Sequence, residues 1–458
     1  MTAARRNRSN LATISLIAAA AAAAGLLTAV ITTTATRLNR NNQHLRRLLT
    51  NSVDDATAAA APTDYHKDEP STIQEGSLIS MQFTADPYVN RDKIEMIKLG
   101  EAKLASLRLL PNSLSEDGSG PPGRYTGVYG TFCVFDDQMN KKDPAVYPTV
   151  DHMMETSDHC IENRYTLPLN EVVEAVTSHD KNADRNERLK RLPISGLLFH
   201  QGFSGAGLIA NALTTFDNTV VLSEHSAIRD ALNACDYIHN RFNSNDCSSS
   251  KHQKLVQDVI SLLSRTSDSN IEHMYLKLDS ASSTYIPLLR SIYPYAKWTF
   301  DYRNADHVLA KSTEPKRTAC MLYKRQPSSV MAFHASDHNL NLEELSTHEV
   351  CALHLSTLLD VASKEHESTG TGMLISYEDD LLKEDAFIET ILPYLGLQKE
   401  IDANPILARA RVEQVLSTKA SVRGIHSQDI DNQWGGEERV HVSEEVRAAS
   451  QLFMKSTM

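Results

Sequence analysis

Residues 196–213, GLLFHQGFSGAGLIANAL, decide the fold. The apolar run at 197–200 is typical of a short buried strand, and apolar residues at helical spacing follow from 208 to 213. Between them lies a loop that contains Gly202, Gly205 and Gly207. Small residues let backbone N–H groups close around an anion, and the N-terminus of a helix adds about half a positive charge. The stretch therefore predicts a strand, loop and helix that bind a phosphate group.

The residues that the loop lacks narrow the phosphate chemistry. Gly202 and Gly207 have the spacing of a Walker A loop, but Leu208 and Ile209 stand where that motif has its Lys and its Ser or Thr. An ATPase or GTPase is therefore not expected. The alternative is a glycine-rich turn between strand and helix that only allows close packing.

Composition sets outer limits on fold and function. A chain of 458 residues suggests one large domain with an N-terminal extension, or two domains. The formal net charge of −12 argues against nucleic acid as a partner, because phosphate backbones require a basic surface. The six cysteines lack CxxC spacing, so no metal site is expected. One or two disulfides would suit an oxidising lumen, and the sequence leaves their pairing open.

The N-terminus predicts a membrane anchor. Residues 9–36 carry no charge, and 11–33 are rich in Ala, Leu and Ile, long enough at about 1.5 Å per residue to cross a hydrocarbon core of roughly 30 Å. We expect a single-pass anchor within 1–36, with a cleaved signal or targeting peptide as the alternative. Arginines flank both sides, so orientation stays open. Residues 37–75 are expected to form a flexible stem.

Two further regions follow the stem. Residues 76–192 predict an N-terminal subdomain, with a helix at 94–110, a strand at 127–136 and a helix at 167–176. From 193 to 400, strands at 219–223, 274–278, 298–302 and 373–376 alternate with helical patterns at 254–264, 285–293, 305–312 and 347–364. This alternation predicts an α/β fold with a parallel sheet flanked by helices. Residues 401–458 are expected to form a C-terminal extension that closes the ligand site.

Ligands of parallel sheets bind at the carboxyl ends of the strands, which selects a few polar residues. Glu224 and His225 follow one strand, Lys277 lies in the next, and Arg303 follows a third. An Arg at a strand end is well shaped for bidentate phosphate binding. Lys277 could instead be an ordinary edge lysine, and His225 an ordinary loop residue.

Together these segments resemble the sulfotransferase family, whose members move a sulfuryl group from 3′-phosphoadenosine 5′-phosphosulfate to an acceptor. The glycine loop resembles the 5′-phosphosulfate loop, and 298–312, WTFDYRNADHVLAKS, resembles the 3′-phosphate segment. MLISYEDD followed by ILPYLGL resembles the late strand and helix of the family. LKLDS and PLLRSIYPYAKW are similar to the membrane-anchored and bacterial branches. The resemblance covers roughly 194–397 and implies a P-loop sulfotransferase fold.

The resemblance implies a set of nucleotide-binding residues. Arg303 and Ser312 would hold the 3′-phosphate, and the 5′-phosphosulfate would lie against the loop residues Gln201, Gly202, Phe203, Ser204, Gly205, Ala206, Gly207 and Leu208. Phe203 stands where many members have Arg or Lys, and Ala206 and Gly207 stand where they have Ser or Thr. Arg303 and Ser312 are also one residue further apart than is usual in the family, so that Lys311 takes the serine position in an ungapped match.

The resemblance also implies catalytic roles and an acceptor. Glu224 is the expected base, with Lys277 and His225 as further catalytic candidates, because tyrosylprotein sulfotransferases place a glutamate at a similar distance from the loop. Glu224 could instead be a favourable helix N-terminal acid. An anchor followed by a stem resembles Golgi sulfotransferases, which favours a luminal protein with a glycan acceptor. The alternative is a noncatalytic descendant that keeps the fold as a binding or scaffold module.

Overall fold

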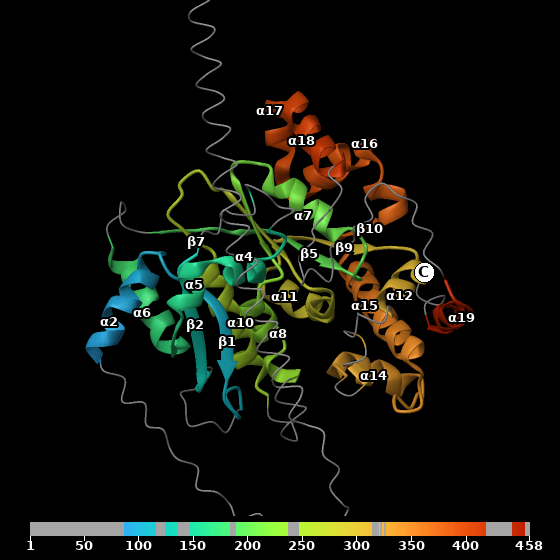
Figure 1. Cartoon of the computed structure of the whole chain (residues 1–458), viewed down its shortest axis with the longest axis horizontal. Helices are drawn as coiled ribbons and strands as arrows, with labels where there is room; N and C mark the ends of the chain where they lie inside the picture. Colours follow the sequence, from blue (N-terminus) through green and yellow to red (C-terminus); the bar gives the residue numbers. More distant parts are fainter. Residues whose placement is uncertain are drawn as a thin grey trace, which may run out of the picture. The chain divides into compact units, whose positions relative to one another are not determined.

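A five-stranded sheet organises the described part of the chain (Figure 1). Its strands are β5 (Ile194–His200), β6 (Thr219–Ser223), β8 (His273–Lys277), β9 (Lys297–Tyr302) and β10 (Met373–Ser376). They lie in the order β10-β9-β5-β8-β6, and every neighbouring pair is parallel. The predicted parallel sheet is confirmed, and its strand bounds agree with the sequence pattern to within a few residues.

The computed structural model describes residues 87–115, 124–135, 141, 147–183, 189–236, 247–313, 320, 323–324, 327–417 and 442–453. They all belong to one compact unit, Phe83–Met458. The predicted anchor at 11–33 and stem at 37–75 lie outside the described residues. Among the helices of the described residues, none is long and apolar enough to cross a lipid bilayer.

The order of the strands selects one edge of the sheet for ligand binding. From the central strand β5 the chain moves to β6 and β8 on one side, and then returns to β9 and β10 on the other. The connections therefore change direction around β5. Parallel sheets bind ligands at such a switch point, outside the carboxyl ends of the strands. The glycine loop leaves β5 at this edge.

Helices cover both faces of the sheet, which explains the apolar run Leu197–Phe199 in the central strand β5 (Figure 1). Leu198 packs with α7 (Ala206–Thr214), α17 (Gln398–Ala403) and α18 (Pro405–Ser417) on one face. Leu197 and Phe199 point to the other face. That second face is covered by α8 (Ser226–Leu232), α10 (Ser249–Leu263), α11 (Ile286–Ile292) and α15 (Thr347–Thr369).

The N-terminal region corrects one prediction. The helix expected at 94–110 is wrong, because α2 (Pro87–Lys98) ends there and β1 (Lys103–Leu109) follows. Gly100 has a left-handed φ of 73°, which is the usual way for a helix to end. β1 pairs with β2 (Val128–Cys133), in agreement with the strand expected at 127–136.

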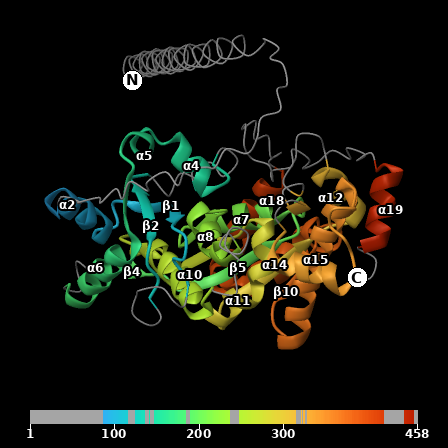
Figure 2. The same cartoon turned by 90° about the horizontal axis from the view of Figure 1, so that it is seen from below.

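The antiparallel sheet of β1 and β2 is completed by β3 (Tyr165–Pro168), which leads into α6 (Leu169–Asn182) at the place where a helix was expected. β1 lies beside α8 and α10 (Figures 1 and 2). The Ser226 hydroxyl donates to the Ala105 carbonyl at 2.7 Å, and the Leu107 amide donates to the Asp230 carboxylate at 3.2 Å. The two sheets therefore share one buried apolar cluster.

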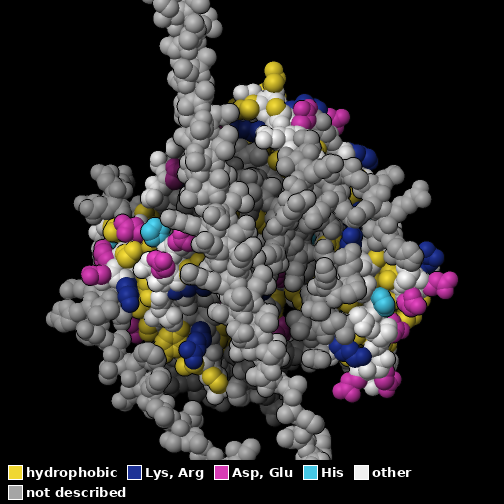
Figure 3. Space-filling model, viewed as in Figure 1, with side chains coloured by type: hydrophobic (Ala, Val, Ile, Leu, Met, Phe, Trp, Pro, Cys, Tyr) yellow, Lys and Arg dark blue, Asp and Glu magenta, His cyan; other side chains and the backbone are white. Residues whose placement is uncertain are grey.

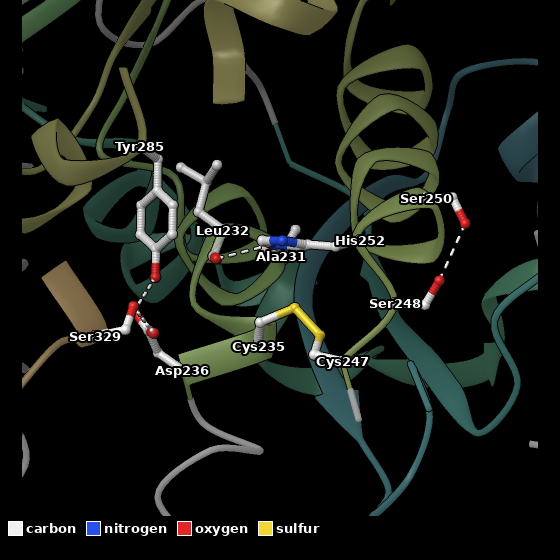
Figure 4. The surroundings of a disulfide bond; sticks show 10 residues. All are labelled: Ala231, Leu232, Cys235, Asp236, Cys247, Ser248, Ser250, His252, Tyr285 and Ser329. Carbon is white, nitrogen blue, oxygen red and sulfur yellow. Dashed lines mark hydrogen bonds between the residues drawn. A yellow bond between two sulfur atoms is a disulfide. The ribbon is translucent and has the colours of Figure 1, made fainter. Parts of the chain in front are cut away.

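All six cysteines form disulfides, so the expectation of one or two was too low. The pairs are Cys133–Cys160, Cys235–Cys247 and Cys320–Cys351. The second pair lies beside Asp236, whose carboxylate accepts hydrogen bonds from the Tyr285 and Ser329 hydroxyls (Figure 4). Three disulfides are typical of proteins from oxidising compartments.

The remaining elements complete the framework. They are α4 (Val150–Thr156), α5 (Asp158–Glu162), β4 (Lys190–Arg191), β7 (Arg265–Thr266), η1 (Ser280–Tyr285), α12 (Ala305–Ser312), α14 (Ser329–Asp337), η2 (Tyr377–Leu381), α16 (Glu384–Ala386), η3 (Phe387–Ile391), η4 (Pro393–Leu397) and α19 (Glu444–Phe453). Within the expected C-terminal extension, α18 packs on α7 and α19 packs on α15 and α12. On the face drawn in Figure 3, acidic and basic side chains of the described residues lie interspersed.

Candidate functional site

The glycine loop has an unusual backbone. Gly202, Phe203 and Gly205 have φ angles of 94°, 50° and 92°, in the left-handed region. Phe203 is not a glycine, and such a conformation costs an L-residue about 1–2 kcal/mol. A Cβ atom at Gly205 would lie 2.8 Å from side-chain atoms of both Leu381 and Tyr377. Strained backbone conformations are concentrated at functional sites, so this loop is a candidate ligand-binding segment.

The start of α7 is open and carries no competing side chain. Gly205 is the N-cap and makes no side-chain cap hydrogen bond, and the first turn contains no acidic residue. A Cβ atom at Gly207 would meet nothing within 4 Å. The Leu208 amide donates to the Gly205 carbonyl at 2.8 Å. Since the first amides of a helix have no intrahelical acceptor, those of Ala206 and Gly207 suit an anion.

His200, which sequence reasoning treated only as a strand residue, holds the loop in place. Its Nδ1 accepts from the Gly202 amide at 3.0 Å, and its Nε2 lies 2.9 Å from the Leu278 carbonyl. Burial, with the Lys277 ammonium, lowers the pKa of His200 to about 3. The ring is therefore neutral at physiological pH, with its proton on Nε2, where it donates to the carbonyl.

Glu224 and Lys277, two predicted catalytic residues, form an ion pair. The Glu224 amide also donates to the Lys277 carbonyl at 2.7 Å, so side chains and backbone join the ends of β6 and β8 twice. Glu224 has a left-handed φ of 50°. The Lys277 side chain is 5% exposed and that of Glu224 is 16% exposed. The structure thus holds a carboxylate and an ammonium together at the carboxyl edge of the sheet.

His225, the third predicted catalytic residue, is the N-cap of α8. Its Nδ1 accepts from the Ala227 amide at 3.1 Å, and the side chain is buried. Burial lowers the pKa of His225 to about 3. The neutral, buried imidazole of His225 therefore caps α8, and a catalytic role for this residue stays a prediction.

Arg303 lies next to the loop but already has partners. Its Nε is 3.4 Å from a Glu378 oxygen, and its guanidinium stacks 4.3 Å above the Tyr377 ring. Its amide donates to the Gln201 side-chain oxygen at 3.4 Å, which connects the segment to the loop. Ser312 is the last residue of α12, so about 10.5 Å of helix rise separates it from Ala305, where that helix begins. The structure brings the Arg303 backbone to Gln201 of the glycine loop, and Ser312 lies at the other end of α12.

Several buried polar atoms at this edge lack a hydrogen-bond partner. Among the described residues they include Gln201 Nε2, Ser204 Oγ, Ser223 Oγ, Thr299 Oγ1 and both carboxylate oxygens of Asp301. Native proteins leave few such atoms, and a group of them calls for an unseen partner. Lys277 aligns with Leu198 and Ser223 across the sheet, and Asp301 aligns with His200. Side chains aligned in this way point to the same face of the sheet. Because Leu198 packs with α7, Lys277, Ser223 and Asp301 lie on the face that α7 covers.

Asp301 was missed by sequence reasoning, although an acid inside the apolar strand WTFDY is a signal. The side chain is fully buried. Burial raises the pKa of Asp301 well above its usual range, and the Lys277 ammonium counters the shift only in part. A carboxyl group held neutral can donate a hydrogen bond, as well as accept one.

The arrangement combines three chemical capacities. Backbone amides at the start of α7 can bind an anion, and the Lys277 ammonium can neutralise negative charge beside it. The Glu224 carboxylate can accept a proton. Arg303 can bind a second anion if it leaves Glu378 or shares its guanidinium with it.

Among known proteins, the chain is similar in structure, and only distantly, to solved sulfotransferases. No protein-family model matches the chain, and no curated protein matches its sequence. It is similar to a crystal structure of a sulfotransferase from Mycobacterium avium, with 11% identity and a TM-score of 0.33, over 63% of this chain and 81% of that one. It is also similar to a sulfotransferase domain from the curacin biosynthetic pathway, with 10% identity and a TM-score of 0.26, over 57% of this chain and 98% of that one.

At TM-scores this low, neither similarity says anything about the reaction of this chain. The structure itself defines the class of the protein. It is an α/β protein with a five-stranded parallel sheet, in which a glycine loop precedes a helix at the switch point.

Proposed function

We propose that this protein is a sulfotransferase that moves a sulfuryl group from 3′-phosphoadenosine 5′-phosphosulfate to an acceptor hydroxyl. The observation that carries the proposal is the group of buried polar atoms without partners around an open helix N-terminus, beside the Glu224–Lys277 ion pair. The order of sequence motifs over 194–397 supports the same reading. The phosphate oxygens of an anionic nucleotide would accept hydrogen bonds from Gln201 Nε2 and from the Ser204 hydroxyl.

The residues present fit the two ends of such a nucleotide. The amides of Ala206 and Gly207 and the Ser204 hydroxyl would hold the 5′-phosphosulfate. Arg303 would hold the 3′-phosphate, with its guanidinium plane already fixed by the Tyr377 ring. Ser312 would assist from the end of α12.

The transfer step needs little from the protein except position and charge. The bound donor supplies the sulfuryl group and the leaving phosphate. The acceptor oxygen forms a bond to sulfur while the bond between sulfur and the phosphate oxygen breaks. Glu224 takes the proton that the acceptor hydroxyl loses. Lys277 lies beside it and neutralises negative charge on the moving group.

The location of the enzyme is part of the proposal. Three disulfides favour an oxidising compartment, and residues 11–33 would anchor the chain in the membrane as a single pass. A Golgi lumen fits both features, with a glycan as the preferred acceptor class. Carbohydrate, tyrosyl and small-molecule acceptors are selected by loops that differ freely on one scaffold.

A noncatalytic binding or scaffold protein is the second candidate, and one observation favours it. The cations expected to meet the nucleotide already contact acids, since Lys277 pairs with Glu224 and Arg303 lies against Glu378. A protein whose site cations are already paired with its own acids could keep the fold and serve as a binding module. Sulfate transfer separates the two candidates.

The experiment is a comparison of sulfated products in cells with and without this protein, using labelled inorganic sulfate. The proposal predicts that one class of sulfated glycan disappears without the protein and returns with the wild-type chain. It also predicts no return with the Glu224→Gln chain at equal abundance. Full return with that variant would contradict Glu224 as the base, and unchanged products in all cells would favour the noncatalytic candidate.

A further inference from the structure

A second group of polar side chains lies at the opposite edge of the main sheet. His273 is the first residue of β8, whose last residue, Lys277, lies at the glycine-loop edge. Glu272 precedes it, and Glu400 comes from α17. One ligand atom from each of these three residues lies within 4.8 Å of the other two. The sequence predicted no metal site because the cysteines lack the spacing, and this group uses none of them.

The His273 ring is oriented by its neighbours. Its Nδ1 lies 3.1 Å from the Ser195 hydroxyl oxygen, and its Nε2 lies 3.5 Å from a Glu400 carboxylate oxygen. When Nδ1–H donates to Ser195, the lone pair of Nε2 faces the carboxylates. Metal-binding histidines commonly have such a second bond, which fixes tautomer and ring orientation.

Glu400 is held from one side and lacks a partner on the other. Its Oε1 accepts from the Asn218 side-chain amide at 2.9 Å. Its Oε2 is a buried atom with no hydrogen-bond partner. The Asn218 carbonyl accepts from the amides of both Glu272 and His273, at 2.8 and 3.1 Å. Asn218 thus holds the Glu400 carboxylate and the backbone at Glu272 and His273.

We propose that Glu272, His273 and Glu400 bind a divalent transition-metal ion, with Zn²⁺ the best match. One imidazole nitrogen and two carboxylates are donors that Zn²⁺ accepts, with bonds of about 2.0–2.2 Å. Tetrahedral geometry then places ligand atoms roughly 3.3–3.6 Å apart. His273 Nε2 and Glu400 Oε1 lie 3.5 Å apart, and the ligand atoms of all three residues lie within 4.8 Å of one another. The fourth position is left to water.

The ion would clamp α17 to the start of β8 and so stabilise the attachment of the C-terminal helices. Because this site lies at the edge opposite the glycine loop, the proposal does not depend on sulfate transfer. Failure of either proposal leaves the other standing.

The test is calorimetric titration of zinc sulfate into the full chain, purified in detergent and freed of metal with a chelator. We expect one Zn²⁺ per chain and a melting midpoint that rises with zinc concentration. Glu272→Gln, an exposed change that spares packing, should weaken binding at least tenfold. Ser195→Ala should weaken it by about 10- to 100-fold, the usual effect of losing a residue that orients a ligand.

His338→Ala is the matched control, because His338 is exposed and lies edge-on to His334, with the ring centroids 4.8 Å apart, so that this pair would be the place for adventitious zinc. It should leave the affinity unchanged. Absence of saturable binding at 100-fold excess over micromolar protein would overturn the proposal. Equal affinity of wild type and Glu272→Gln would overturn it as well, and so would loss of binding in His338→Ala alone.

Discussion

Gly207→Ala separates the stability of the loop from its ability to bind an anion. Gly207 is the second residue of α7, and a Cβ atom there would meet nothing within 4 Å. The Cβ atoms of a helix tilt toward its N-terminus, so the new methyl group would enter the space in front of the first turn. That is the space where the account places the phosphosulfate.

The two expected effects have opposite signs. Ala stabilises a helix relative to Gly by about 0.5–1 kcal/mol, and no clash offsets this gain. A hydrogen bond to a charged group contributes about 1.5–3 kcal/mol, so displacing one amide contact should weaken nucleotide affinity at least about tenfold. The variant should therefore melt at a slightly higher temperature and bind 3′-phosphoadenosine 5′-phosphate more weakly.

Thermal melting with and without nucleotide measures both effects in one assay. Gly205→Ala is the matched control. Gly205 has a left-handed φ of 92°, and an added Cβ atom would contact Leu381 and Tyr377, so this substitution should destabilise the fold by about 2 kcal/mol or more. A Gly207→Ala protein that is more stable but binds nucleotide as wild type does would refute the placement of the phosphosulfate at α7.

Four other changes test separate parts of the account. Glu224→Gln should lower transfer by about 100-fold or more while nucleotide affinity holds, as steady-state rates and calorimetry would show. Arg303→Ala should weaken nucleotide binding by about 1.5–3 kcal/mol, and an unchanged Kd would reject its role. Deletion of residues 1–50 should leave a soluble protein that melts cooperatively, whereas aggregation would show that the segment packs on the domain. Burial lowers the pKa of His354 to about 4, so the unfolded chain binds more protons between pH 4 and 6.5 and stability falls as pH decreases through that window. His354→Phe, which keeps the stacking on Tyr323, should make this dependence less steep in denaturant titrations at pH 5 and 7, and the buried His200 and His225 account for part of what remains.

The sequence predicted the main sheet well because its strands are largely buried and therefore mostly apolar. β6 and β10 begin and end as expected, at Thr219–Ser223 and Met373–Ser376. The N-terminal helix was drawn too long because an apolar pattern continues from α2 into β1. Only Gly100, in its left-handed conformation, marks the boundary between them.

The site was predictable only in part. Small residues predict an anion-binding loop, and polar residues that follow strands predict the carboxyl edge of the sheet. Glu224, Lys277 and Arg303 were therefore predicted from sequence to lie at this edge, where the structure places them, and their roles stay predictions. The partner of Arg303 was not, because Glu378 lies far along the chain. Asp301 and His200 were missed as site residues because both belong to predicted strands. Their protonation depends on how deeply the folded protein buries them, which the sequence pattern does not give.

Calorimetric titration of the wild-type full chain with 3′-phosphoadenosine 5′-phosphate measures directly whether the protein binds this nucleotide. We expect saturable binding to one site per chain, and clearly weaker binding of adenosine 5′-phosphate, which lacks the group assigned to Arg303. Absence of heat and of any thermal shift at millimolar nucleotide would rule out the nucleotide site and, with it, sulfate transfer from this donor.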